Sequence, residues 1–139
     1  MKVLVWWSAA DWSTADVARG YYNAFSRMVG CEVRKFPYND WLRYHSHAMG
    51  MYVEEHPDRK DGNEELQSAV MQLASEKGLA DAIRFDADVV IVTSGMGVHP
   101  DALYMLKRLG YTIVLLCTES PYDDEHHAYL AQFVDLVTV

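Results

Sequence analysis

The sequence has few cysteines and no long hydrophobic run. It holds two cysteines in 139 residues and no Cys-x-x-Cys pair, so it lacks the cysteine density of a disulfide scaffold and the spacing of a zinc site. Cys31 and Cys117 each lie in an apolar run, which predicts two buried, reduced thiols. The longest apolar runs, at 3–7 and 113–117, are far shorter than the ~18 residues of a membrane-spanning helix. A disulfide miniprotein and a membrane partner are therefore excluded.

Basic residues are also scarce. Twelve Lys and Arg against 20 Asp and Glu give a formal charge of −8, and the basic residues are scattered, so we do not expect direct nucleic-acid binding. The apolar run after Lys2 is too short for a signal peptide and leads into Asp11. We therefore expect a cytoplasmic protein.

Five strand-like segments are present, at residues 2–7, 31–36, 88–93, 112–117 and 135–139, and most of them are apolar. Segments that are apolar throughout are typical of strands buried on both faces, as in parallel sheets. Composition agrees with a globular domain, because half of the residues are apolar and 23% are charged.

Helical patterns separate these segments. A helix begins near Ser13 or Thr14, and a long one with Leu66, Val70, Leu73 and Ile83 facing inward precedes the third strand. Shorter helices are predicted from Pro100 to Leu109, with Leu109 facing the core, and from Pro121 through Phe133, whereas residues 37–62 read as an irregular part with one aromatic helix. The alternation predicts one α/β domain over residues 1–139, a Rossmann-like, doubly wound parallel five-stranded sheet in the order 2-1-3-4-5.

Ligands of such sheets bind beyond the carboxyl ends of the strands. Three loops are expected there, at residues 8–14, 94–99 and 118–122. Ser13 and Thr14 either bind an anion at the start of a helix or only cap it. Ser94, Gly95 and Gly97 either let a substrate approach the backbone or form a tight turn.

Three side chains are candidates for acid–base chemistry. Glu119 directly follows a buried strand, where desolvation raises a carboxyl pKa towards the range of a general base; the alternative is a brace to nearby loop amides. His99 and Asp11 are catalytic candidates at the same edge, and the alternative for His99 is a helix N-cap.

Several known site types are missing. There is no G-x-G-x-x-G after the first strand and no G-x-x-x-x-G-K-[ST], which argues against dinucleotide and Walker-type sites. His45 and His47 are two residues apart and would point to different sides of a helix, and His126-His127 is a weak signal, so no metal site is expected. The acidic residues of a phospho-receiver are replaced by Ser8-Ala9 and Thr93-Ser94.

The last forty residues carry a resemblance. The segments LKRLGY, TIVLLCTESPYDDE and YLAQFVDLVTV, with the opening MKVLVWW and STADVARGYYNAF, resemble the N-terminal half of GT-B glycosyltransferases, in the spore-maturation-protein-like branch of bacteria and their phages. The resemblance covers both ends of the chain and is poor over residues 37–62. TESPY is its most specific part.

This resemblance implies an N-terminal, acceptor-side domain of an enzyme that uses a nucleotide-sugar donor. Glu119, Ser120 and Tyr122 would line the cleft between two halves, flanked by Ser13, Thr14 and His99. The implied partners are the acceptor, the nucleotide sugar as co-substrate and a C-terminal donor-binding domain; no cofactor is implied. The second half and the glycine-rich turn after the first strand are absent from this sequence, so we expect the isolated chain to be inactive.

Two other function classes stay open. The chain could be a non-enzymatic module that holds a nucleotide or sugar, or an interaction domain whose aromatic segment from Trp41 to Tyr52 docks a partner. Exposed apolar surface near residues 133–139 would favour a half of a larger enzyme, and a covered one a finished module. We also expect weak self-association through the end strand and the Met49–Met51 segment.

Overall fold

The sheet has the predicted architecture. A computed structural model describes residues 1–8, 15–58, 63–118 and 124–138. All strand pairs are parallel and the order is β2-β1-β3-β4-β5, which confirms the five-stranded Rossmann-like α/β fold. The strands are β1 (Lys2–Trp6), β2 (Glu32–Phe36), β3 (Val89–Thr93), β4 (Thr112–Leu116) and β5 (Leu136–Thr138).

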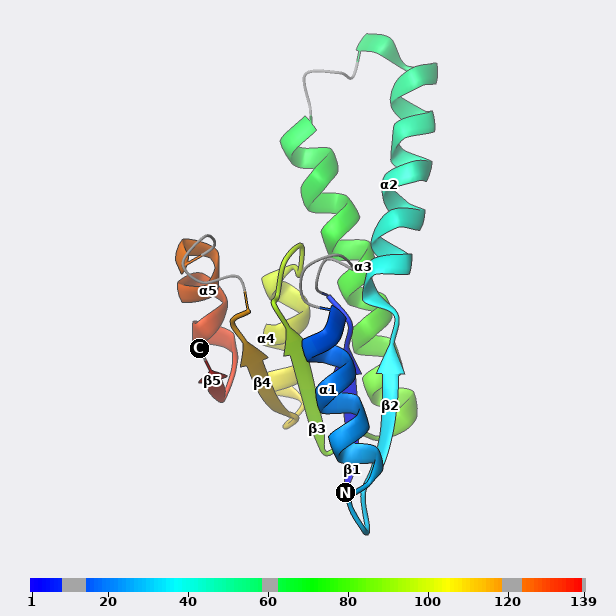
Figure 1. Cartoon of the computed structure of the whole chain (residues 1–139). Coiled ribbons are helices and arrows are strands. Elements are labelled where there is room, and N and C mark those ends of the chain that lie inside the picture. Colours follow the sequence, from blue (N-terminus) through cyan, green and yellow to red (C-terminus); the bar gives the residue numbers. More distant parts are fainter. Residues whose placement is uncertain (9–14, 59–62, 119–123, 139) are drawn as a thin grey trace.

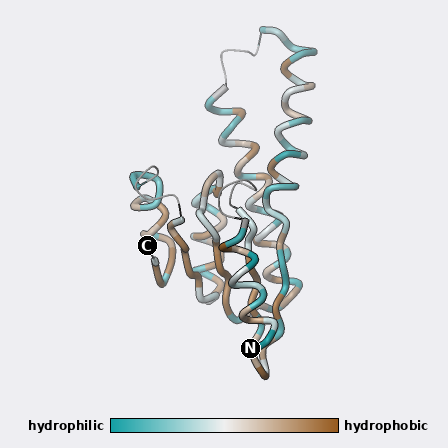
Figure 2. Tube along the Cα trace, viewed as in Figure 1, coloured by the Kyte–Doolittle hydropathy of each residue, from teal (hydrophilic) through white to brown (hydrophobic). Residues whose placement is uncertain are grey.

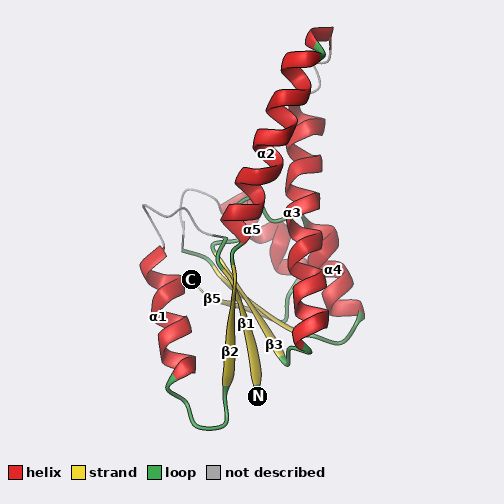
Figure 3. Cartoon of the chain, turned by 90° about the vertical axis from the view of Figure 1, so that its right-hand side faces the viewer, coloured by secondary structure: helices red, strands yellow, loops and turns green. Residues whose placement is uncertain are grey.

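Helices cover both faces of the sheet (Figure 3). They are α1 (Ala15–Ser26), α2 (Tyr38–Glu55), α3 (Asn63–Phe85), α4 (Pro100–Arg108) and α5 (Asp124–Leu130), followed by the short 3₁₀ turn η2 (Ala131–Phe133). From β1 the chain crosses to β2 on one side, and the later connections lead to β3, β4 and β5 on the other side of β1. Because such crossovers are right-handed, α1 lies on one face, and α3, α4 and α5 lie on the other (Figure 1).

Alternate strand residues enter two separate cores. Leu4 and Trp6 of β1 belong to the larger core under α3 and α4, whereas Val3 and Val5 belong to the smaller core under α1. All four are fully buried. A strand whose two faces are both covered needs apolar residues at every position, which explains the continuous runs in the sequence.

The segment predicted to be irregular with one aromatic helix holds a longer helix than expected, and this helix forms one arm of a helical hairpin. α2 begins directly after β2 and runs for 18 residues, and it packs along α3. Figures 1 and 3 show α2 and the first half of α3 projecting beyond the carboxyl edge of the sheet. In Figure 2 the distal hairpin is mostly polar, whereas the strands are hydrophobic. Within the described residues, no helix combines the length and hydropathy needed to cross a membrane.

The inward faces of two helices differ from the prediction. Leu73 and Ile83 of α3 and Leu109 after α4 are 39%, 51% and 54% exposed. The buried face of α3 instead carries several small residues, and the Trp6 ring of β1 lies against one of them. A Cβ atom at Gly78 would lie 2.5 Å from Trp6 Cζ2. Gly78 therefore leaves room for the Trp6 ring between α3 and the sheet.

Candidate functional site

The β3–α4 loop has an unusual backbone at the carboxyl edge. Ser94, Gly95 and Gly97 have φ angles of +66°, +76° and +72°, in the left-handed region. A Cβ atom at Gly95 would lie 2.8 Å from Leu130 Cδ1, so glycine is required there for packing as well as for conformation. The tight-turn interpretation therefore accounts for Gly95.

Two histidines of α5 hold this loop. His127 Nε2 lies 2.7 Å from the Ser94 carbonyl oxygen, and His126 Nε2 lies 3.1 Å from the Gly95 carbonyl oxygen. Because a carbonyl oxygen only accepts, each Nε2 carries the donated proton. In the neutral His127 ring, Nδ1 is then an acceptor. The histidine pair positions a loop, and among the described residues no cluster of three or more ligands could hold a metal ion.

Four buried polar side-chain atoms in or near this loop have no hydrogen-bond partner within the described part of the chain. They are Thr93 Oγ1, Ser94 Oγ, Thr118 Oγ1 and His127 Nδ1, and we call them the polar cluster. They come from the carboxyl ends of the adjacent strands β3 and β4 and from α5, which is bound to the same loop. Two other such atoms, Trp6 Nε1 and His45 Nε2, belong to residues facing α3.

Unpartnered buried hydroxyls are costly. Each one forgoes the hydrogen bonds it made with water, at a cost of about 1–3 kcal/mol. Thr93 and Ser94 are completely buried, and Ser8 donates its own hydroxyl proton to the Thr93 carbonyl oxygen. A bound molecule that supplies partners recovers this free energy.

His99 is occupied by the fold. Its Nδ1 accepts from the Asp101 backbone N–H at 3.3 Å, which makes it the N-cap of α4. Its Nε2 lies 3.4 Å from Ser68 Oγ, and its backbone N–H donates to Ser75 Oγ at 2.9 Å. The N-cap alternative is confirmed, and both ring nitrogens contact groups of the chain itself.

A tyrosine missed in the sequence locks the same loop to the helical hairpin. The Tyr38 hydroxyl lies 2.6 Å from the Gly97 carbonyl oxygen, to which it donates, and 2.8 Å from Ser75 Oγ. Burial raises the pKa of this phenol far above its usual range, an effect that the Ser75 hydrogen bond only partly offsets. Tyr38 is therefore a neutral donor that fixes Gly97.

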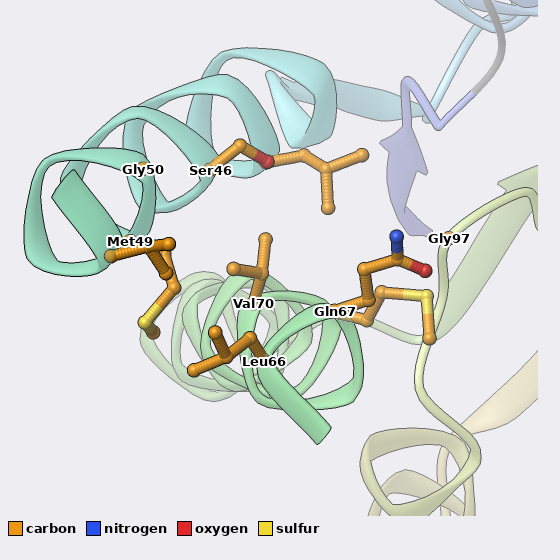
Figure 4. A pocket seen from close by; sticks show the side chains of 10 residues that line it. Ser46, Met49, Gly50, Leu66, Gln67, Val70 and Gly97 are labelled. Carbon is orange, nitrogen blue, oxygen red and sulfur yellow. The ribbon is translucent and has the colours of Figure 1, made fainter. Parts of the chain in front are cut away.

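A hollow of about 540 Å³ lies between α2 and α3, and Gly97 of the β3–α4 loop is part of its lining. Figure 4 shows Val70 pointing between the two helices and Gln67 lying towards Gly97. A Cβ atom at Gly97 would lie 3.2 Å from Leu42 Cδ2. The lining residues are Leu42, Ser46, Met49, Gly50, Val53, Leu66, Gln67, Val70, Met71 and Gly97.

The two cysteines differ in their surroundings. Cys117 is buried beside the polar cluster, and burial, with the nearby negative charge of Asp124, raises the pKa of its thiol. Cys31 is half-buried and also free, so the prediction of buried thiols is right for Cys117 alone. The remaining predicted site residues, Asp11, Ser13, Thr14, Glu119, Ser120 and Tyr122, lie outside the described residues.

Comparisons with known proteins give no match: no family model, no curated protein and no solved structure is similar to this chain.

Proposed function

We propose that this chain is the acceptor-side domain of a cytoplasmic glycosyltransferase that uses a nucleotide-sugar donor. The polar cluster carries the proposal. Its hydroxyls both donate and accept hydrogen bonds, and the His127 Nδ1 accepts. A sugar or another polyhydroxylated acceptor offers the same mixed chemistry. The cluster lies at the carboxyl ends of parallel strands, where folds of this type bind ligands.

The segment that resembles the family begins at the same place. Thr118, whose hydroxyl belongs to the polar cluster, opens the TESPYDDE segment. In the proposed reaction Glu119 takes the proton of the acceptor hydroxyl. The acceptor oxygen then bonds to the anomeric carbon of the donor sugar, and the nucleoside diphosphate leaves with the electrons of the broken bond. A C-terminal domain would hold the donor.

The exposed end of the sheet also supports this proposal. Leu136 and Val137 of β5 are 55% and 38% exposed, as expected for a domain that packs against a further one. Exposed apolar residues on an edge strand are also consistent with the weak self-association expected from the sequence.

A sugar-binding module without catalysis is the second candidate. His99, one of the three acid–base candidates, has both ring nitrogens close to groups of the chain. If Glu119 also acts only as a brace, binding without transfer remains. Within a chain that carries both halves, Glu119→Gln distinguishes the two candidates. An enzyme loses turnover and retains acceptor binding, whereas a module has no turnover to lose.

The proposed acceptor site can be tested by NMR on the ¹⁵N-labelled chain. We expect at least one of a panel of methyl glycosides to shift the backbone amides of Ser94, Gly95 and Thr118, and UDP-glucose alone to leave them unchanged. Thr118→Val, which replaces the hydroxyl by a methyl group, should weaken the sugar response. Shifts caused by UDP-glucose but by no glycoside would indicate a nucleotide module, and no shift at these amides would refute the proposed site.

A further inference from the structure

We propose that the hollow between α2 and α3 binds an uncharged, apolar part of a ligand, and that the acceptor is therefore amphiphilic, with a hydroxylated head and an apolar tail. The identity of the ligand as an acceptor rests on the proposed function. The chemistry of the hollow does not, because it follows from the lining residues alone.

The lining determines the class of ligand. Apart from Ser46 and Gln67, the side chains around the hollow are aliphatic or belong to methionine. Among the described residues, no charged side chain lines it, although the chain as a whole carries a charge of −8. A charged group would lose its hydration there without gaining a partner. Met49 and Met71 are unbranched and adapt to the shape of a ligand.

The size and rigidity of the hollow suit a small molecule. Its volume of about 540 Å³ lies within the ~300–1,000 Å³ typical of ligand pockets. One wall is held in place before binding, because the Tyr38 hydroxyl fixes the Gly97 carbonyl and bonds to Ser75 of α3. A preformed wall does not have to be ordered when the ligand binds.

The hollow lies beside the loop that carries part of the proposed acceptor site. Gly97 lines the hollow, and Ser94, three residues earlier in the same loop, contributes to the polar cluster. A single molecule can therefore place its apolar part between α2 and α3 and its hydroxyl groups at the ends of β3 and β4. A hollow on an unrelated surface of the molecule would not allow this.

Gly50 offers a matched pair of test variants. It lines the hollow from α2, and a Cβ atom there would meet nothing within 4 Å. Gly50→Ala leaves the hollow open, whereas the ring of Gly50→Phe would occupy it. Both replace a glycine inside a helix by a residue with a higher helix propensity. Ala48→Phe places the same ring at an exposed position of α2 and is a control for added aromatic surface.

The probe is N-phenyl-1-naphthylamine, an uncharged apolar dye whose fluorescence rises on burial. We expect saturable binding of one dye per chain, equal binding by Gly50→Ala and Ala48→Phe, and at least about tenfold weaker binding by Gly50→Phe. Circular dichroism and the melting temperature should show that Gly50→Phe stays folded. Absence of saturable binding, or equal affinities of Gly50→Phe and Gly50→Ala, would overturn the inference.

Octyl β-D-glucoside, below its micelle concentration, then separates this inference from the proposed function. Displacement of the dye together with shifts at Ser94 and Thr118 supports both. Displacement without those shifts supports the apolar site and contradicts the sugar site. Failure to displace the dye contradicts the amphiphilic acceptor, whatever happens at Ser94.

Discussion

The sheet and the helical hairpin are built on different principles. In β1 every residue from Val3 to Trp6 is fully buried, whereas Tyr38 is the only buried residue of the 18 in α2. The sheet is stabilised by dense packing on both faces. The projecting part of the hairpin is stabilised mainly by contacts between two helices, and it leaves a hollow between them (Figures 1 and 4).

This difference separates stability from recognition. The sheet holds the β3–α4 loop at a fixed edge, and the hairpin adds apolar surface next to that loop. Binding residues often lie on segments that a rigid scaffold positions. Changes in the sheet should therefore affect folding, and changes in the projecting hairpin should affect binding.

The largest expected contrast comes from two leucines truncated to alanine. Leu103 of α4 is fully buried in the larger core, so Leu103→Ala should lower the free energy of unfolding by about 2–5 kcal/mol. Leu66→Ala in the half-buried lining of the hollow should cost less than about 1.5 kcal/mol. Urea unfolding measures both, and equal losses would show that the hairpin is packed as tightly as the core.

Two glycines in long helices should respond in opposite directions. Gly78→Ala would place a methyl group 2.5 Å from the Trp6 ring and should cost about 1–3 kcal/mol. Gly50→Ala meets open space and should stabilise by about 0.5–1 kcal/mol through helix propensity. Thermal unfolding of the two variants gives the signs, and a stabilising Gly78→Ala would contradict the tight contact between Gly78 and the Trp6 ring.

These glycines also show what the sequence could predict. Apolar strands separated by helical patterns were sufficient to predict the sheet and its order, because each strand is recognisable locally. In the sequence, Gly78 only weakens the middle of a helical pattern. Its contact with Trp6, which is 72 residues earlier in the chain, explains why a glycine stands there. The prediction that Leu73 and Ile83 face inward is wrong because a periodic pattern does not show which face of a helix the sheet will cover.

The candidate site was predicted less completely. The loop that holds Ser94, Gly95 and Gly97 could be predicted, because loops after parallel strands are recognisable in the sequence. The hydroxyls of Thr93 and Thr118 were missed, although a polar residue that ends an apolar strand is a usable signal. Tyr38 could not be found locally, because its partners Ser75 and Gly97 are 37 and 59 residues away.

The joint between the two regions should weaken at alkaline pH. Burial raises the pKa of Tyr38 in the folded state, so its contribution is complete below the ordinary tyrosine pKa of about 10. Above that pH the unfolded chain loses the proton first, and stability falls by up to about 1.4 kcal/mol per pH unit until the folded pKa is reached. Urea unfolding from pH 9 to 11 should show a shallower decline for Tyr38→Phe; identical slopes would contradict a buried, neutral Tyr38.

The most direct test of the central claim, that the polar cluster is reserved for a ligand, is the stability of Thr93→Val without any ligand. Valine keeps the β-branched shape and removes a buried hydroxyl that has no partner. The free energy of unfolding in urea should therefore rise by about 1 kcal/mol. As a control, Ser8→Ala removes a hydroxyl that donates to the Thr93 carbonyl and should lower stability. A Thr93→Val variant that is less stable than the wild type would show that the hydroxyl stabilises the fold and would contradict the account.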